Sequence, residues 1–314
     1  MKYLNDSFTD KLLAKTTLIT NKVSKELKTF AKNKKIKIIQ TSKIKKKNIQ
    51  NLDIKGSIVL SAGSPWIFKK EIIKKLGKNF FNVHQSPLPS MRGSVATYII
   101  MYDIKAFQTC IHRVTAGIDT GNIVYKKNFM IPSTLRVPYD VNEYLQLKNR
   151  EMVKEFLKNF NEKKLTEEKQ NNFFSSYNKR CSANINGWID WSMDVDDLDR
   201  FVRAYGYPYG GARTFIGNSK VQIENIEKSK NESARHPEEV GKVLRKYEGN
   251  VVVSVIGGSL FIKKISKNKK NIFDLIKAGD KFFTKIKYLD FKNNRAIFVN
   301  KTNIYNKKVK IKKF

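Results

Sequence analysis

Short apolar runs alternate with amphipathic, lysine-rich stretches through the first half of the chain. The runs at residues 16–20, 36–39, 56–61 and 80–84 are typical of buried strands. Residues 22–32 and 68–76 carry their apolar side chains at helical spacing. Strands that alternate with helices predict an α/β domain with a mostly parallel sheet and helices on both faces. Ligands of such sheets bind beyond the carboxyl ends of the strands, which makes the segment after Phe81 the expected site.

The second half has a different pattern. Residues 143–160 predict a long helix, and the polar segment after it lacks periodicity. Short apolar runs at 221–223, 240–243, 251–255 and 260–262 are then separated by turn residues, which is typical of a small antiparallel barrel. A five-stranded barrel of the oligonucleotide-binding type (OB-like) fits the length. We therefore divide the chain into a first domain over 1–162, a linker over 163–183 and a β domain over 184–314.

Composition excludes several classes of protein. The 314 residues and a hydrophobic fraction of 40% suit two packed domains. The two cysteines support neither a disulfide framework nor a zinc site. No apolar stretch is long enough to cross a membrane, and the first residues lack the apolar core of a signal peptide. We therefore expect a cytoplasmic protein without a membrane association or a metal.

The net charge of +34 suggests nucleic acid as a partner, but it has a second explanation. Lysine supplies most of this charge, and lysine, asparagine and isoleucine are all abundant. Such a composition fits an A/T-rich coding bias as well as it fits a binding surface. Arginine, which binds phosphate in a bidentate manner, would be the sharper signal.

The densest group of chemically useful residues begins in the strand at 80–84. Asn82 and His84 are two apart, so a strand projects both from one face. A neutral imidazole can exchange a proton near pH 7, and an amide can stabilise a developing oxyanion. Pro87 and Pro89 then restrict the next loop, and Gly93 permits an unusual backbone turn.

A second group surrounds Asp119, which Gly117 and Gly121 bracket in a short loop. A helix and a strand fit between His84 and this loop, so both can lie at one sheet edge. A carboxylate beside an imidazole fixes the tautomer of the ring and raises its basicity. Taken singly, a histidine at a strand end or an aspartate between glycines is usually structural. The combination in this order is what points to a site.

These motifs, namely Asn82-Val-His84, Ser86-Pro-Leu-Pro89, Arg92-Gly93 and Gly117-Ile-Asp-Thr-Gly121, resemble the signature of formyltetrahydrofolate-dependent formyltransferases. The resemblance runs from about Thr16 onward and implies a Rossmann-like formyltransferase fold. It implies that Asn82 and His84 stabilise an oxyanion while Asp119 tunes His84 and helps to remove the amine proton. The donor would be 10-formyltetrahydrofolate, and no metal would take part. The folate pocket would be lined by Ser86, Pro87, Leu88, Pro89, Arg92, Gly93, Gly117, Ile118, Thr120 and Gly121.

The chain departs from this family at its start and in the proline-rich loop. Members of the family usually open with a strand that is central in the sheet, whereas the run at 16–20 looks like their second strand. We therefore expect the first strand to be absent or strongly diverged, which would expose apolar surface. Gln85 and Pro87 also differ from the commoner family residues.

The family resemblance leaves the amine acceptor open between several branches. The two-domain layout disfavours the purine-precursor enzymes. Residues 129–140, 207–212 and 278–284 look closer to the enzymes that formylate nucleotide-linked amino sugars, which we favour. The positive charge favours the alternative, methionyl-initiator tRNA. A basic binding module that retains an inactive formyltransferase fold is a further alternative, although Asn82, His84 and Asp119 are all present. The sequence also leaves the oligomeric state open, a homodimer included.

Overall fold

The computed structural model describes residues 14–293, 295–298 and 310–313. Its chain opens with a parallel pair of strands, β1 (Thr17–Thr20) and β2 (Lys37–Gln40), joined through helix α3 (Lys25–Asn33). Ser24 caps α3, because its side chain accepts the Leu27 N–H. The two short helices α4 (Lys46–Ile49) and α5 (Lys70–Leu76) come next, on either side of strand β3 (Val59–Ala62).

A four-stranded sheet forms the centre of the first domain, in the order β3-β4-β6-β7. It adds to β3 the strands β4 (Phe80–His84), β6 (Ala106–Arg113) and β7 (Ile123–Met130). Strands β3 and β4 are parallel, as the alternating pattern predicts, whereas β6 is antiparallel to both β4 and β7. The sheet is therefore mixed. The loop between β6 and β7 is too short for a crossover, which forces them to run in opposite directions.

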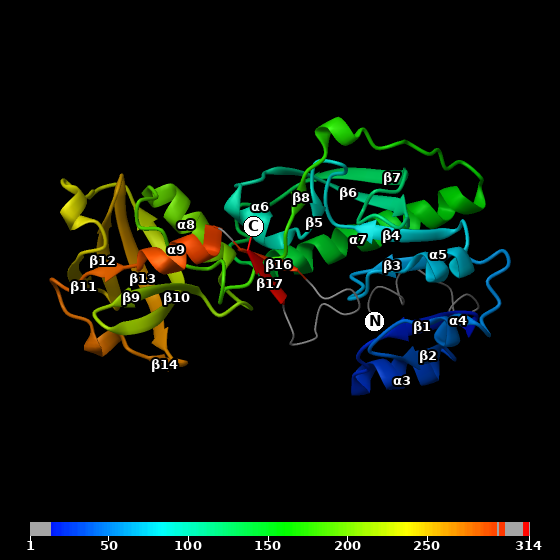
Figure 1. Cartoon of the computed structure of the whole chain (residues 1–314), viewed down its shortest axis with the longest axis horizontal. Helices are drawn as coiled ribbons and strands as arrows, with labels where there is room; N and C mark the ends of the chain where they lie inside the picture. Colours follow the sequence, from blue (N-terminus) through cyan, green and yellow to red (C-terminus); the bar gives the residue numbers. More distant parts are fainter. Residues whose placement is uncertain (1–13, 294, 299–309, 314) are drawn as a thin grey trace.

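Successive side chains of a strand point to opposite faces of the sheet, so neighbouring residues of β4 pack against different helices. Phe81 and Val83 pack on the long helix α7 (Pro138–Asn161), together with its Met152 and Phe156. Phe80, on the other face of β4, packs against Ile72 of α5 and its neighbours. Helices therefore cover both faces, as the sequence predicts, and α7 lies along the sheet (Figure 1).

We expect the first strand of the family to be absent or strongly diverged before Thr16. Residues 1–13 lie outside the described part of the chain. Within the described part, β1 pairs only with β2, and β3 pairs only with β4. The pair β1–β2 therefore forms its own two-stranded sheet instead of extending the central one.

Helix packing and strand pairing both join the first domain to the rest of the chain. Helix α6 (Ala96–Met101) packs against helix α8 (Val195–Ala204), and Ala204 joins the core formed by α6 and α7. The linker supplies the short strand β8 (Tyr177–Asn178), which pairs in parallel with β5 (Arg92–Gly93). Figure 1 shows β8 beside β5, next to the central sheet.

The last part of the chain is a curled antiparallel sheet of seven strands in the order β11-β12-β13-β10-β9-β15, with β14 added to β13. An antiparallel bridge between Lys242 and Lys281 joins the region before β11 to the region before β15, so the sheet curls back on itself. Trp191, Val195 and Phe201 belong to its core. Seven strands exceed the five that we predict, and the OB-like assignment stays a prediction. The strands are β9 (Ala212–Ile216), β10 (Ser219–Ser229), β11 (Val243–Tyr247), β12 (Asn250–Val255), β13 (Gly258–Lys267), β14 (Lys270–Asn271) and β15 (Phe282–Phe283).

The described part ends with α9 (Ile286–Asn293) and an antiparallel pair, β16 (Arg295–Phe298) and β17 (Lys310–Lys313). Three single turns of 3-10 helix complete the structure: η1 (Asn172–Phe174), η2 (Pro237–Glu239) and η3 (Phe273–Leu275).

Candidate active site

Four polar side chains meet on one face of the central sheet. Asn82 and His84 leave β4 on the face opposite Phe81, and His112 of β6 lies directly across the strands from Asn82. Asp119, from the loop after β6, reaches all three. Its carboxylate lies 3.6 Å from His84 Nδ1, 3.4 Å from His112 Nε2 and 3.4 Å from Asn82 Nδ2. The structure thus brings together the trio predicted from the sequence and adds a fourth member.

The position of Asp119 depends on an unusual backbone conformation. Asp119 itself has a positive φ of 52°, whereas its bracketing glycines, Gly117 and Gly121, do not. Aspartate is one of the few residues that adopt this left-handed conformation at modest cost. The glycines matter because they lack a side chain: a Cβ on Gly121 would overlap the Arg113 carbonyl oxygen. The carboxylate is then fixed by the Gly93 N–H, which donates to Asp119 Oδ2 over 3.0 Å.

His84 is buried, and its two ring nitrogens have different surroundings. Nε2 lies 3.0 Å from the Met91 carbonyl oxygen and 2.5 Å from Ser86 Oγ. A carbonyl oxygen can only accept, so Nε2 carries the proton in the neutral ring. The Met91 carbonyl is the nearer acceptor, at 3.0 Å against 3.6 Å from Nδ1 to Asp119, and the role of Asp119 in fixing the tautomer stays a prediction. Nδ1 keeps a lone pair on the side of Asp119, where it can take up a proton.

Burial and charge act in opposite directions on these groups. Burial lowers the pKa of His84, and the charge of Asp119 only partly offsets this effect, so the ring is neutral at pH 7. Burial by itself would raise the pKa of Asp119. The hydrogen bond to His112, the charges of His84 and His112 and the Gly93 N–H outweigh it and lower the pKa to about 2. A neutral imidazole thus faces a permanent carboxylate.

The residues predicted to line a cofactor pocket differ in their surroundings. Ser86 and Gly93 contact the trio directly, through His84 and Asp119 respectively. Leu88 is buried, in a small core with Cys110 and Ile123, and it precedes the cis peptide bond to Pro89. Ile118 presents an apolar side chain, 42% exposed, next to Asp119.

The side chains of Arg92 and Thr120 form hydrogen bonds with residues other than Asp119. The Arg92 guanidinium donates to Gln170 and Asn172 of the linker. The Thr120 hydroxyl lies 2.8 Å from that of Thr115 and closes the loop. Pro87 belongs to the turn after β4, where its carbonyl oxygen accepts the Met91 N–H.

Comparison with known proteins shows which proteins the chain is similar to. Residues 183–278 match the family model for the C-terminal domain of formyl transferases. Methionyl-tRNA formyltransferase of Thermosipho melanesiensis is 26% identical over 259 residues, which cover 79% of this chain and 81% of that protein. The C-terminal match and this alignment, which spans both domains, agree with the geometry of the four polar side chains. The C-terminal part of the chain thus matches a formyl transferase domain, and the chain as a whole is similar to methionyl-tRNA formyltransferases.

Other similar proteins carry different names. The bifunctional polymyxin resistance protein ArnA of Wigglesworthia glossinidia brevipalpis is 30% identical over 194 residues, which cover 56% of this chain and 28% of that protein. Two solved structures share the fold. One is WlaRD, a sugar 3N-formyltransferase (TM-score 0.58, 24% identity, 81% of this chain and 88% of that chain). The other is an N-formyltransferase from Helicobacter canadensis (TM-score 0.62, 22% identity, 83% and 93%).

His112 is the residue of this candidate site that sequence reasoning missed. It is 2% exposed, its Nε2 lies 3.2 Å from Asn82 Nδ2, and its Nδ1 faces the Arg113 carbonyl oxygen at 2.8 Å. The signal that could have found it is the alternation of β6, in which Cys110 and His112 share a face. Placing that face against Asn82 requires the strand register, which the sequence alone does not provide.

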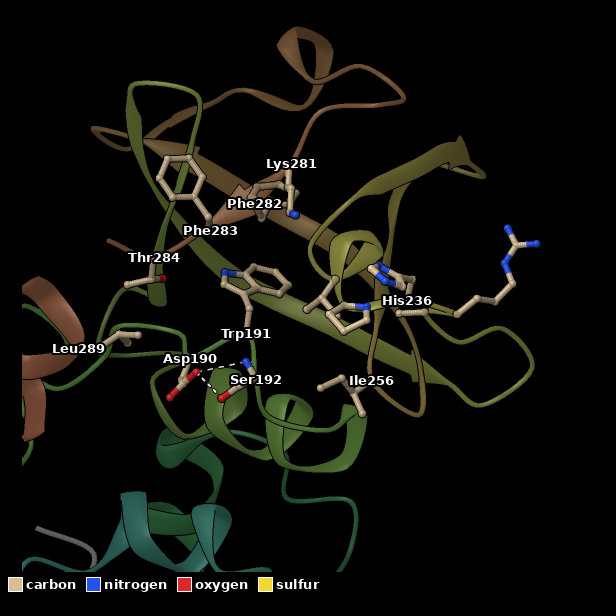
Figure 2. Close-up of a pocket in the computed structure, with 14 residues that line it drawn as sticks. Asp190, Trp191, Ser192, His236, Ile256, Lys281, Phe282, Phe283, Thr284 and Leu289 are labelled. Atoms are coloured by element: carbon tan, nitrogen blue, oxygen red, sulfur yellow. Dashed lines mark hydrogen bonds between the residues drawn. The ribbon is translucent and has the colours of Figure 1, made fainter. Parts of the chain in front are cut away.

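A separate cavity of about 490 Å³ lies in the C-terminal part of the chain (Figure 2). Aromatic and aliphatic side chains such as Trp191, Phe282 and Ile256 line it, beside the cationic Lys281. The polar groups there already have partners: the Lys281 ammonium donates to Glu238, and His236 Nδ1 accepts the Glu238 N–H. None of the four residues of the candidate site, Asp119 included, lines this cavity.

In the part of the chain that the structure describes, no cluster of three or more histidine, cysteine, aspartate or glutamate side chains could hold a metal ion. No helix within the same residues has the length and hydrophobicity needed to span a bilayer.

Proposed function

We propose that this formyltransferase moves the formyl group of 10-formyltetrahydrofolate onto the amine of a nucleotide-linked amino sugar. The observation that carries the formyl-transfer chemistry is the convergence of Asn82, His84 and Asp119 at one edge of the sheet. A proton acceptor, a carboxylate and an amide donor are the groups that acyl transfer to an amine requires.

In this mechanism His84 takes the proton that the amine loses. Its Nδ1 is unprotonated in this form of the neutral ring and lies 3.6 Å from Asp119 Oδ2. Once protonated, Nδ1–H can donate to Asp119 Oδ2, so the carboxylate stabilises the imidazolium as it forms. The Met91 carbonyl holds the opposite nitrogen, which prevents the ring from turning.

Asn82 supplies a hydrogen-bond donor for the oxyanion that develops when an amine adds to a formyl carbon. Its Nδ2 has two long contacts, 3.2 Å to His112 Nε2 and 3.4 Å to Asp119 Oδ1. Such contacts are weaker than an ordinary hydrogen bond, so the amide can turn one N–H toward a stronger acceptor at low cost. A charged oxyanion is such an acceptor.

The residues of both loops are chemically suited to a folate. A planar, partly apolar pterin requires an exposed apolar surface beside the reacting groups, and Ile118 provides one next to Asp119. When bound, 10-formyltetrahydrofolate would supply an activated formyl group.

Two kinds of acceptor remain in competition. Residues 129–140, 207–212 and 278–284 resemble the nucleotide-sugar enzymes, and this likeness supports our choice. The second candidate is methionyl-initiator tRNA. It is favoured by relatives that are named methionyl-tRNA formyltransferases and by the net charge of +34.

The test is formylation of two acceptor sets by the purified protein with 10-formyltetrahydrofolate, with the products identified by mass spectrometry. One set is a panel of nucleotide-linked 3-amino and 4-amino sugars, and the other is methionyl-initiator tRNA. Formylation of a sugar supports the proposal. Formylation of the tRNA alone replaces the proposed acceptor by the second candidate. If neither set is formylated while His84→Ala and wild type behave alike, the enzymatic role itself is wrong.

A further inference from the structure

The loop that presents Asp119 has to be held from outside, because its own conformation is unfavourable. Asp119 has a φ of 52°, and a left-handed conformation is unfavourable for a residue other than glycine. The hydroxyl pair of Thr115 and Thr120 closes the loop but does not touch the backbone at Asp119. The carbonyl oxygens of Asp119 and Gly121 point away from the loop and need donors.

Gln170 of the linker supplies both of these donors. Its Nε2 donates to the Asp119 carbonyl oxygen over 2.9 Å and to the Gly121 carbonyl oxygen over 2.7 Å. Both amide hydrogens are thereby used, one on each side of the turn. Gln170 is itself buried, at 7% exposure, so water competes little for these bonds.

The other end of the same side chain holds the second loop of the site. Gln170 Oε1 accepts from Arg92 Nη2 over 2.8 Å and from Arg92 Nε over 3.2 Å. Arg92 directly precedes Gly93, whose N–H donates to the Asp119 carboxylate. One amide group therefore connects the backbone of Asp119 to the strand whose N–H fixes its carboxylate.

Backbone pairing next to Gln170 fixes the position of this residue along β7. Glu168 and Ile123 form an isolated antiparallel bridge in which each N–H donates to the other's carbonyl, over 2.9 Å and 2.8 Å. Ile123 is the first residue of β7 and comes two residues after Gly121. The linker is thus paired to the start of β7, and Gln170 lies two residues after the bridge.

We propose that Gln170 is a positioning residue that sets where the Asp119 carboxylate stands relative to His84. This inference rests on the proposed function for its consequence in catalysis. A displacement of a reacting group by about 1 Å can cost 100-fold in rate, so loss of this side chain should act on turnover more than on binding.

The test compares Gln170→Met with Asn172→Ala. Methionine keeps the length of the side chain but removes both donors and the acceptor. Asn172 accepts from the same Arg92, but its side chain takes no part in the hydrogen bonds to the Asp119 loop, so its variant is the matched control. We expect Gln170→Met to lower kcat by about 10- to 100-fold with KM changed by less than about threefold, and Asn172→Ala to stay near wild type.

A second measurement does not require turnover. The chain has three histidines, so NMR titration can follow the ring of His84 by itself. Asp119 raises the pKa of His84, so a carboxylate that drifts away should lower it in Gln170→Met and leave it unchanged in Asn172→Ala. An unchanged pKa together with an unchanged kcat would overturn the proposal. If wild type proves inactive with every acceptor, the proposed function fails, and the titration still decides the role of Gln170.

Circular dichroism and thermal unfolding establish that the variants are folded. Should Gln170→Met not fold, Gln170→Glu takes its place in the rate measurement. Glutamate keeps an acceptor for Arg92 and loses the two donors to the loop. A kcat equal to that of wild type in this variant would again overturn the proposal.

Discussion

Replacing Asp119 by asparagine tests the electrostatic part of the mechanism with little change of shape. The asparagine Oδ1 can still accept the Gly93 N–H, so the loop should keep its position. What is lost is the negative charge 3.6 Å from His84 Nδ1 and 3.4 Å from His112 Nε2. The imidazolium that forms when His84 takes up a proton then has no counter-ion.

The magnitude can be worked out from Coulomb's law. Two unit charges about 4 Å apart attract each other by about 4 kcal/mol at an effective dielectric constant of about 20, which suits a partly buried pair. The pKa of Asp119, lowered from 3.8 to about 2, corresponds to about 2 kcal/mol of interaction with its surroundings. Since about 1.4 kcal/mol is a factor of ten in rate, Asp119→Asn should lower kcat by about 30- to 1,000-fold.

The assay is the release of tetrahydrofolate from 10-formyltetrahydrofolate in the presence of the amine acceptor, measured from pH 5 to pH 9. The variant should also shift the rising limb of its kcat/KM profile to lower pH. The reason is that the charge of Asp119 raises the pKa of His84, and asparagine does not. A kcat within threefold of wild type, with an unmoved profile, would refute this account of Asp119.

Three further outcomes are expected. His112→Ala should lower kcat by about tenfold with the fold intact, because Asn82 and Asp119 lose a shared neighbour; steady-state kinetics and thermal unfolding measure the two effects. The stability that Asp119 contributes is present above its unfolded pKa near 3.8 and is lost as the pH falls toward 2, so urea unfolding of wild type and Asp119→Asn should converge over that range. Gly121→Ala should destabilise the protein by about 3 kcal/mol, visible as a lower Tm, since its Cβ meets the Arg113 carbonyl oxygen.

Much of the first domain could be predicted from the hydrophobic pattern. The runs at 16–20, 36–39 and 80–84 coincide with β1, β2 and β4 within one or two residues. The strand β7 was missed, because after Tyr125 its residues alternate between exposed and half-buried and leave no continuous apolar run. The antiparallel pairing of β6 with β7 was missed for the same reason. The direction of pairing can be predicted from a connecting loop only when both strands have been recognised.

The site was predictable where the side chains share a strand and not where they meet across strands. Asn82 and His84 are expected together from a period of two, and the Asp119 loop is expected from its glycines. His112 and Gln170 join them only through the register of β6 and the pairing of the linker with β7. The polar composition of 163–183 indicates a linker, whereas the structure shows that this segment contacts both loops of the site.

The central claim is that Asn82, His84 and Asp119 transfer a formyl group from a folate to an amine. Its most direct test is a single-turnover measurement of tetrahydrofolate release from 10-formyltetrahydrofolate, with and without the amine acceptors and with His84→Ala as the control. The account predicts release that requires an acceptor and that falls by about 100-fold or more in His84→Ala, as expected for loss of the proton acceptor. Release at the wild-type rate in that variant would contradict it, as would the absence of release from wild type with every acceptor.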